Sequence, residues 1–239
     1  MKDKYADLPN EIKQAHFDKL NLYKEELRHS PELKSLFIEM TVQCNEHCRH
    51  CGSKCEYTNG DEPLTDNEIL QCLIQLKKDL ESRGKKLPFL DITGGEPLLR
   101  PGMIDLMKTI HMLGYNWGMT SNGTLITDEV ARQLKEAGMY SIGLSLDGTP
   151  EVHNHNRDDS FEKIDFDFFH TTWPFQGVKM TLTEYSLYHL ADSIKYIHSL
   201  GIKEINGVNL FEGEFDWNDE KYVRILIPQL NDLVDFYSK

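Results

Sequence analysis

Hydrophobic and polar positions follow a repeating order along most of the chain. Short apolar runs rich in β-branched residues are each followed by a longer segment whose apolar positions have helical spacing. The runs predict six strands, at residues 36–42, 89–93, 115–120, 140–146, 177–183 and 204–210. Alternating strands and helices of this kind build parallel sheets with helices on the outer face. The expected fold class is α/β, a partial (β/α)6 TIM-like barrel with parallel strands.

Capping residues support the helical segments between these strands. Thr65 to Glu68 has the form of a capping box, Thr127 is a candidate N-cap, and Pro101 is a candidate first residue of another helix. Several segments end at a glycine, as helices closed by a left-handed residue do. These glycines are Gly84, Gly114, Gly138 and Gly201.

The first 35 residues precede the strand and helix repeat. They are polar and charged, and Ile12, Phe17 and Leu20 belong to an apolar face that predicts one amphipathic helix over about residues 9–28. We therefore expect a helical lead-in at 1–35 and a barrel domain at 36–239. The lead-in helix is expected to pack on the outside of the barrel.

Residues suited to chemistry follow the ends of the predicted strands. Three cysteines follow the first strand, Gly94 to Pro97 follows the second, and Ser121 to Gly123 follows the third. Asp147-Gly148 follows the fourth strand, and Phe211 to Gly213 follows the sixth. Because the carboxyl ends of parallel strands meet at one edge, where ligands bind, we expect these loops to lie close together.

Cys44, Cys48 and Cys51 form a C-x3-C-x2-C run. Thiolates at this spacing suit an iron-sulfur cluster or zinc. No distant C-x2-C or H-x3-H pair completes a zinc set, so a cluster is favoured over zinc and over a metal-free loop. Three ligands on a four-iron cluster leave one iron open. Cys55 is either a fourth ligand or a free thiol beside the cluster, and Cys72 is expected to be a small buried residue.

Composition narrows the classes of function. The chain has 26 Lys and Arg against 39 Asp and Glu, a net charge of -13, and no long basic tract, which disfavours nucleic acid and anionic membranes as partners. The cysteines are clustered, unlike those of an extracellular disulfide framework. The first residues lack the apolar segment of a signal peptide, and no apolar run reaches the roughly 18 residues of a membrane span. We expect a cytoplasmic protein.

The cysteine run together with Gly94-Gly-Glu-Pro97 resembles the radical S-adenosylmethionine (SAM) superfamily over about residues 36–215, most closely its peptide-modifying SPASM/Twitch subgroup. The resemblance implies that Cys44, Cys48 and Cys51 hold a 4Fe-4S cluster whose fourth iron binds SAM. It also implies that SAM is cleaved to methionine and a 5′-deoxyadenosyl radical that abstracts hydrogen from the substrate. An electron donor such as flavodoxin or ferredoxin is then expected.

The resemblance further implies a set of SAM-binding residues. Independently of it, two glycines let a backbone approach a ligand closely, Pro97 stiffens the chain, and the carboxylate of Glu96 suits an ammonium group. In the family, an aromatic residue at the position of His50 lies beside adenine, and an arginine at the position of Arg157 reaches the SAM carboxylate. The expected SAM contacts are His50, Gly94, Gly95, Glu96, Pro97, Ser121, Asn122, Ser145, Arg157, Lys179 and Asn209.

Several of these positions have a simpler alternative. Asn154 stands where the family has Asp, and Asp158-Asp159 replaces a glycine after Arg157, so a surface salt bridge between Arg157 and these aspartates is the alternative. For His50 the alternative is a solvated loop histidine. Lys179 belongs to an alternating strand in which either SAM binding or ordinary exposure explains the polar side.

The favoured function is radical modification of a ribosomally made peptide, forming a thioether or carbon-carbon crosslink. The alternatives are an activase for a glycyl-radical enzyme, a radical SAM step in cofactor biosynthesis, and a non-catalytic metal-stabilised binding module. No cysteine follows Cys72, so the C-terminal auxiliary-cluster domain of the extended subgroup is expected to be absent or truncated. The sequence indicates no catalytic residue beyond the cofactor site.

Overall fold

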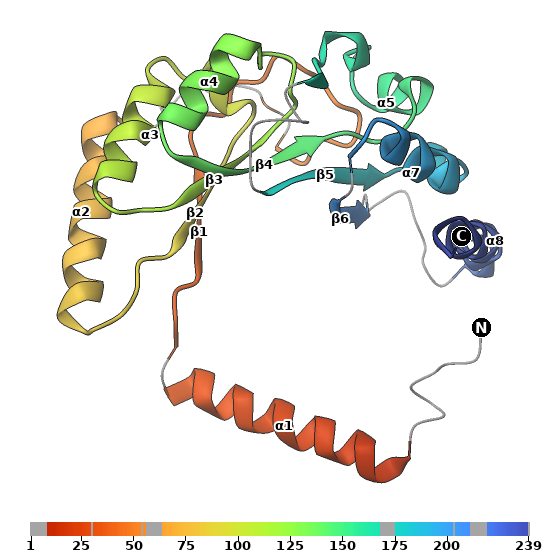
Figure 1. Cartoon of the computed structure of the whole chain (residues 1–239), viewed down its shortest axis with the longest axis horizontal. Helices are drawn as coiled ribbons and strands as arrows, with labels where there is room; N and C mark the ends of the chain where they lie inside the picture. Colours follow the sequence, from red (N-terminus) through yellow and green to blue (C-terminus); the bar gives the residue numbers. More distant parts are fainter. Residues whose placement is uncertain are drawn as a thin grey trace.

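The computed structural model describes residues 9–29, 31–53, 55, 64–167, 175–202, 204–210 and 219–238. Strands and helices alternate along the chain (Figure 1). The strands are β1 Ser35–Glu39, β2 Phe89–Thr93, β3 Trp117–Ser121, β4 Met139–Ser145, β5 Phe175–Leu182 and β6 Ile205–Leu210. The α-helices are α1 Asn10–His29, α2 Asp66–Ser82, α3 Met103–Met112, α4 Asp128–Glu136, α5 Pro150–Asn156, α6 Glu184–Leu187, α7 Leu190–Ser199 and α8 Glu220–Tyr237. The 3-10 helices are η1 Pro97–Leu99 and η2 Phe161–Lys163.

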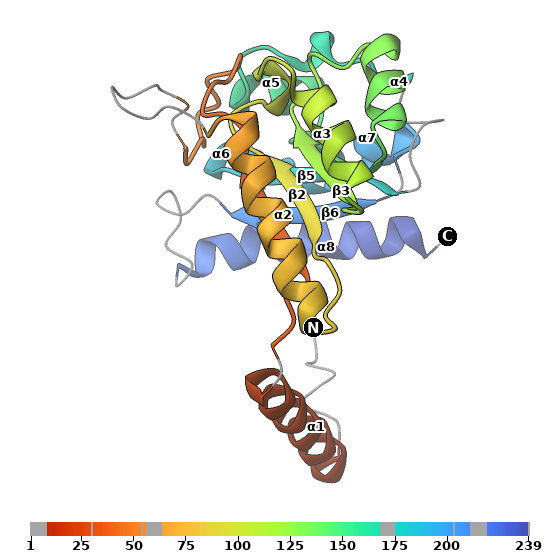
Figure 2. The same ribbon diagram turned by 90° about the vertical axis from the view of Figure 1, so that its left-hand side faces the viewer.

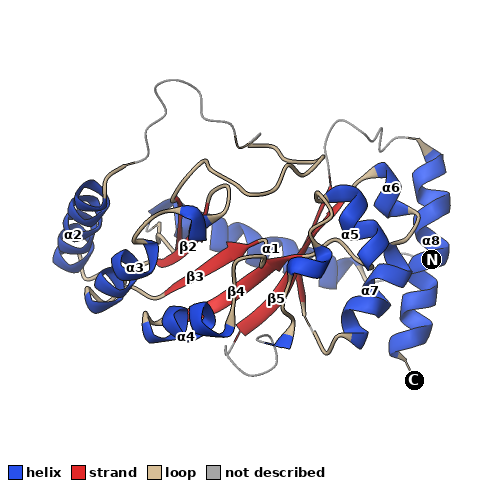
Figure 3. Cartoon of the chain, turned by 90° about the horizontal axis from the view of Figure 1, so that it is seen from above, coloured by secondary structure: helices blue, strands red, loops and turns tan. Residues whose placement is uncertain are grey.

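The six strands form one parallel sheet in the order β1-β2-β3-β4-β5-β6. The sheet curls into a half-barrel, and helices cover its convex face (Figure 3). This confirms the predicted fold class and all six predicted strands, whose bounds shift by only a few residues. Strand order follows chain order because each helical crossover returns the chain to the next position in the sheet.

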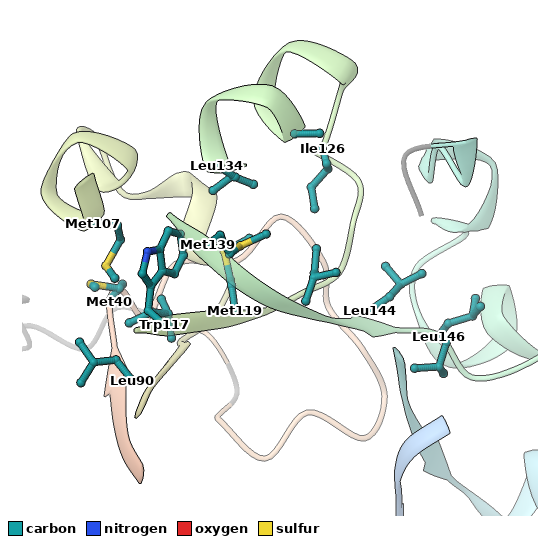
Figure 4. Packing of buried hydrophobic residues seen from close by; sticks show 14 of the residues in the cluster. Met40, Leu90, Met107, Trp117, Met119, Ile126, Leu134, Met139, Leu144 and Leu146 are labelled. Carbon is teal, nitrogen blue, oxygen red and sulfur yellow. The ribbon is translucent and has the colours of Figure 1, made fainter. Parts of the chain in front are cut away.

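The hydrophobic core lies between the convex face of the sheet and the helices. Figure 4 shows side chains from β2, β3 and β4 packed under α3 and α4. Trp117 is fully buried, and its indole N–H donates to the carbonyl oxygen of Ala137 at 3.0 Å. Burying a large apolar side chain contributes about 1.5–3 kcal/mol, so this layer is the main source of stability.

Strand β5 shows how the two faces of the sheet differ. Met180 and Leu182 point into the core and are buried, whereas Lys179 and Thr181 alternate with them and are only partly buried. The alternation predicted for this strand is therefore confirmed for residues 179–182, whereas Thr183, predicted on the polar side, is buried and caps α6. Its polar side chains lie on the concave face of the half-barrel.

The helix caps agree with the sequence except at one position. Thr65 and Glu68 form the predicted capping box of α2, and the Thr127 side chain caps α4. The four predicted closing glycines have positive φ angles between 63° and 99°. Pro101 does not begin α3, because Gly102, with φ of 72°, occupies the N-cap and the helix starts at Met103.

The packing expected for α1 is wrong. The helix forms as predicted, but none of its residues is buried, and Phe17 keeps 57% of its surface exposed. Figures 1 and 2 show α1 standing apart from the sheet and its covering helices. Among the described residues, no helix combines the length and the apolar composition required to cross a membrane.

Candidate metal and cofactor site

Gly94 and Gly95 bring the loop after β2 against the loop after β1. The amide of Gly95 donates to the Thr41 carbonyl at 2.8 Å, and the amide of Glu96 donates to the Gln43 carbonyl at 2.7 Å. A Cβ atom at Gly94 or Gly95 would overlap the backbone of Thr41 or Gln43. The two glycines are therefore required for contact with the protein's own chain, at the start of the cysteine run.

Glu96 links the loops after β2 and β3. Its carboxylate is fully buried and accepts hydrogen bonds from the Ser121 hydroxyl, from the Asn122 amide at 2.9 Å and from the Leu98 amide at 3.2 Å. Burial raises the pKa of Glu96 to about 7, although these hydrogen bonds oppose the rise. An ammonium contact by Glu96 stays a prediction, since its carboxylate already joins the two loops.

Asn122 extends this link to the cysteine run. Its Nδ2 donates to Oδ1 of Asn45 at 2.8 Å and lies 4.0 Å from Sγ of Cys44. The other end of its amide, Oδ1, accepts from the backbone and the hydroxyl of Thr124. The loops after β1, β2 and β3 thus meet at one edge of the sheet, as the sequence predicted.

Cys44, Cys48 and Cys51 lie in this loop and are partly exposed. Burial raises the pKa of the Cys44 and Cys48 thiols, and binding of a metal would oppose this by favouring the thiolates. Soft sulfur donors of this kind fit an iron-sulfur cluster. Among the described residues, no three His, Cys, Asp or Glu side chains gather as they do around a single metal ion.

The two other cysteines have different surroundings. Sγ of Cys55 lies 3.6 Å from Sγ of Cys51, and burial raises the pKa of Cys55 to about 12. This position agrees with a fourth ligand and with a free thiol beside the cluster. Cys72 is exposed on α2, so its predicted burial is wrong: it lies on the solvent side of the helix, while Ile69 and Leu73 face the core.

Arg157 is buried and forms a two-pronged ion pair with Asp147. Its Nε donates to Oδ2 of Asp147 at 2.7 Å and its Nη2 donates to Oδ1 at 3.2 Å. The alternative of a surface salt bridge with Asp158 or Asp159 is wrong, because only 8% of Arg157 is exposed and its carboxylate partner comes from the end of β4. Burial would raise the pKa of Asp147, but the charges of Arg157 and His50 bring it below its usual value.

The third nitrogen of the Arg157 guanidinium faces the cysteine loop. Nη1 lies 3.7 Å from Sγ of Cys48 and 4.0 Å from Oε2 of Glu46. Glu46 is almost fully buried and accepts from the Cys48 thiol at 3.3 Å. Burial raises the pKa of Glu46, against the opposing effects of Arg157 and of hydrogen bonds.

Two histidines complete this buried group. The side chain of His50 is 7% exposed, with Nε2 3.8 Å from Asp147, so the alternative of a solvated loop histidine is wrong. His153 is fully buried; its Nδ1 accepts from the amide of Asp147 at 3.4 Å, and its Nε2 lies 2.9 Å from the Ser160 hydroxyl. Burial lowers the pKa of His153 to about 4, which keeps its ring neutral.

The two departures from the family pattern have local partners. Asn154 donates to both carboxylate oxygens of Glu162, and an Asp there would repel that carboxylate. Asp158 adopts a positive φ of 52°, a conformation that glycine adopts freely and Asp tolerates. Its carboxylate accepts from the amide of His47 at 2.8 Å, and so fastens the cysteine loop.

Ser145, Lys179 and Asn209 lie on the concave face. Ser145 is beside Lys179 in the register of β4 and β5, and Asn209 is beside Thr181 on β6. Lys179 borders a cavity of about 150 Å³ that Asp91 and Thr120 also line. The SAM contacts of these three residues stay predictions. The expected loop at Phe211 to Gly213 lies outside the described residues.

Sequence reasoning missed three residues of the site, namely Glu46, Asp147 and His153. Asp147 is followed by a glycine, and because Asp-Gly pairs are common in turns, the sequence assigns Asp147 no specific role. The sequence does contain a signal for two of them. Glu46 lies between two cluster cysteines and Asp147 follows the end of a strand, so each places an acidic residue near the cysteine loop. Their burial and their common partner Arg157 depend on the folding of residues far apart in the chain.

Comparison with known families agrees with this geometry. The family model for the radical SAM superfamily matches residues 38–165, more than half of the chain. The chain belongs to the radical SAM superfamily. Proteins of this superfamily use a 4Fe-4S cluster and SAM, and the soft cysteine set at the carboxyl edge of the sheet fits the cluster.

Solved radical SAM structures share the fold. Native anSMEcpe with bound AdoMet has a TM-score of 0.63 and 22% sequence identity, covering 84% of this chain and 59% of that one. Streptococcus suis SuiB bound to the precursor peptide SuiA also has a TM-score of 0.63, at 16% identity, covering 92% of this chain and 51% of that one. At these identities the likeness concerns the fold alone.

Curated radical SAM relatives have closer sequences over shorter ranges. An AdoMet-dependent heme synthase of Oleidesulfovibrio alaskensis is 28% identical over 194 residues, covering 78% of this chain and 48% of the relative. A GTP 3',8-cyclase of Rippkaea orientalis is 34% identical over 143 residues, covering 58% of this chain and 40% of the relative. The chain thus spans less than half the length of either relative.

Proposed function

We propose that this chain is a radical SAM enzyme in which Cys44, Cys48 and Cys51 bind the cluster. The observation that carries the proposal is the meeting of the cysteine loop with the Gly94 to Pro97 loop and with Asn122 at the carboxyl edge of one parallel sheet. A bound cluster of this family supplies the electron that cleaves SAM and so starts hydrogen abstraction from a substrate.

The chain's own residues then have distinct roles. Gly94 and Gly95 seat the second loop against the cysteine loop, and Glu96 holds the third loop beside it. The backbone of this second loop, with Ser145 and the polar concave face, supplies hydrogen-bonding groups for SAM. The half-barrel excludes water from the reacting centre by covering one side with its sheet and helices.

We infer a peptide as the substrate, modified by a thioether or carbon-carbon crosslink. Support comes from the fold shared with SuiB, which was solved with its precursor peptide, and with anSMEcpe, which was solved with AdoMet and a peptide. The concave face carries both positive and negative side chains, namely Lys179, Asp91 and Glu39. This mixture of charges suits a polar substrate. An electron carrier such as flavodoxin or ferredoxin is the proposed reductant.

A role in cofactor biosynthesis is the second candidate. Sequence likeness favours it, because the 34% identical relative is a GTP 3',8-cyclase and another relative is a heme synthase. In that reading the polar concave face receives a small molecule in place of a peptide. The two candidates share the cofactor site and differ in the substrate alone.

Anaerobic reconstitution tests the shared part. We expect about four irons per chain, and 5′-deoxyadenosine on addition of SAM and dithionite, with both lost when Cys44, Cys48 and Cys51 are replaced by alanine. One zinc and no iron per chain would contradict the proposal and favour a metal-stabilised binding module. The Cys72→Ala variant is the matched control, because Cys72 is an exposed cysteine away from the loop.

Isotope transfer separates the substrates. A deuterated candidate peptide, encoded beside the gene, is expected to pass deuterium to 5′-deoxyadenosine. Deuterium transfer from labelled GTP, with none from the peptide, would contradict the peptide proposal and support the cyclase-like reading. Deuterium transfer from a deuterated glycine of a glycyl-radical partner protein to 5′-deoxyadenosine would support the activase alternative.

A further inference from the structure

Asp147 holds the guanidinium of Arg157 in one orientation inside the protein. Asp147 is fully buried and accepts two hydrogen bonds from Arg157 and one, at 2.8 Å, from the amide of Thr181. These bonds tie the end of β4 to β5 and to the residue after α5. A two-pronged pair of this kind sets the plane of the guanidinium as well as its position.

The fixed orientation directs the remaining guanidinium nitrogen at a cluster cysteine. Nη1 of Arg157 lies 3.7 Å from Sγ of Cys48, within hydrogen-bond range for sulfur. The nearby carboxylate of Glu46 lies 4.0 Å from the same nitrogen, so Arg157 also offsets a negative charge beside the sulfur. Because 8% of Arg157 is exposed, water screens this contact weakly.

We propose that Arg157, positioned by Asp147, sets the reduction potential of the cluster through its contact with the sulfur of Cys48. Hydrogen bonds to cluster sulfurs and nearby charge are two of the factors that set such potentials. Reduction adds one electron to the cluster, and a cation at a ligand sulfur stabilises the more negative state. Arg157 therefore makes the cluster easier to reduce. The inference rests on the proposed cluster site and is independent of the substrate.

This role differs from the SAM carboxylate contact that the family resemblance implies for Arg157. A carboxylate contact requires bound SAM, whereas the contact with Cys48 joins two side chains of the protein itself. The two roles are compatible, since the guanidinium has five N–H donors. They are separated by measuring the potential in the absence of SAM.

The test is a redox titration of the anaerobically reconstituted protein without SAM, followed by electron paramagnetic resonance. At a fixed solution potential, we expect Arg157→Met to lower the ratio of reduced to oxidised cluster at least about threefold. Arg49→Met is the matched control, because Arg49 adjoins Cys48 in sequence while its Nη1 faces His155 at 3.5 Å. An unchanged ratio in Arg157→Met, or an equal fall in both variants, would overturn the proposal.

Iron and sulfide content separates failure of this inference from failure of the cluster site. Absence of iron in the reconstituted wild type would contradict the cluster site itself. Four irons per chain in Arg157→Met, with an unchanged ratio of reduced to oxidised cluster, would contradict only the role of Arg157. If Arg157→Met takes up no cluster, Arg157→Lys is used instead. Lysine keeps the positive charge but cannot contact Asp147 and Cys48 together through one planar group. The ratio of reduced to oxidised cluster is therefore also expected to fall in Arg157→Lys.

A double-mutant cycle tests Asp147 as a positioning residue. Asp147→Asn is measured alone and in the Arg157→Met background. If Asp147 acts by holding Arg157, its effect on the ratio is expected to differ at least about threefold between the two backgrounds. The same effect in both backgrounds would show that Asp147 acts by its own charge, and would overturn its positioning role.

Discussion

The carboxylate of Glu96 accepts a hydrogen bond of 2.9 Å from the backbone amide of Asn122, and Asn122 in turn contacts Asn45 beside Cys44. This series of contacts joins the loops after three consecutive strands. The cysteine loop is therefore held in place by contacts with the two neighbouring loops. Organisation of this kind reduces the conformational entropy that cluster binding has to overcome.

The cysteines are the first target for substitution. Replacing Cys48 by alanine is expected to lower bound iron well below the wild-type level, because a three-cysteine site loses one of its few anchors. Iron per chain after anaerobic reconstitution measures this. Cys55→Ala, in the same loop, decides whether the thiol 3.6 Å from Cys51 is a ligand: retained iron means that it is not required.

Gly95→Ala is expected to destabilise the fold by about 2–3 kcal/mol, because the added methyl group overlaps the backbone of Gln43. Urea unfolding gives the free energy. Gly52→Ala is the control, since no atom lies within 4 Å of the methyl group it adds. Equal stability of the two variants would contradict the close approach of the loops.

His153 predicts a pH dependence of stability. Its pKa is about 4 in the folded protein, below the ordinary value of 6.5, so unfolding takes up a proton between these values. Its contribution is fully present above pH 6.5 and is lost as the pH falls toward 4, by about 3 kcal/mol. His153→Gln does not titrate there. Urea unfolding of both proteins from pH 7 to pH 4 is expected to show the advantage of the wild type shrinking; parallel curves would contradict the neutral buried histidine.

Ser145→Ala is expected to weaken SAM binding about fivefold, the effect of losing one hydrogen bond of roughly 1 kcal/mol. Calorimetric titration of the reconstituted protein measures the affinity. Ser141→Ala is the control on the same strand and the same face, farther from the carboxyl edge of the sheet. Unchanged affinity in Ser145→Ala would remove this residue from the SAM site.

Substitutions on α1 are expected to leave the stability of the barrel within about 0.5 kcal/mol of the wild type. Phe17→Ser and Leu20→Ser test this, because both side chains are more than half exposed. Leu134→Ala in the buried layer under α4 is the positive control, with an expected loss of about 2–5 kcal/mol. A comparable loss in the α1 variants would show that the helix packs on the barrel.

Local sequence patterns were sufficient to predict the strands, the capping box at Thr65 and the glycines that close the helices. These features depend on residues only a few positions apart in the chain. The shared edge of the loops followed from parallel strand order. The position of α1 did not follow from its apolar face, because amphipathic spacing indicates a helix without indicating what covers it. Residue type likewise predicted that Cys72 is buried, whereas it lies on the solvent side of α2.

The cysteine spacing, the Gly94 to Pro97 motif and the edge of the sheet where they meet all follow from the sequence. Two contacts became visible only in the folded chain: Glu96 holds a neighbouring loop, and Asp147, in place of Asp158 or Asp159, is the partner of Arg157. The reason is physical. Motif chemistry is carried by residues close together in the chain, whereas the partner of a buried charge is chosen by burial and geometry among residues that only folding brings together.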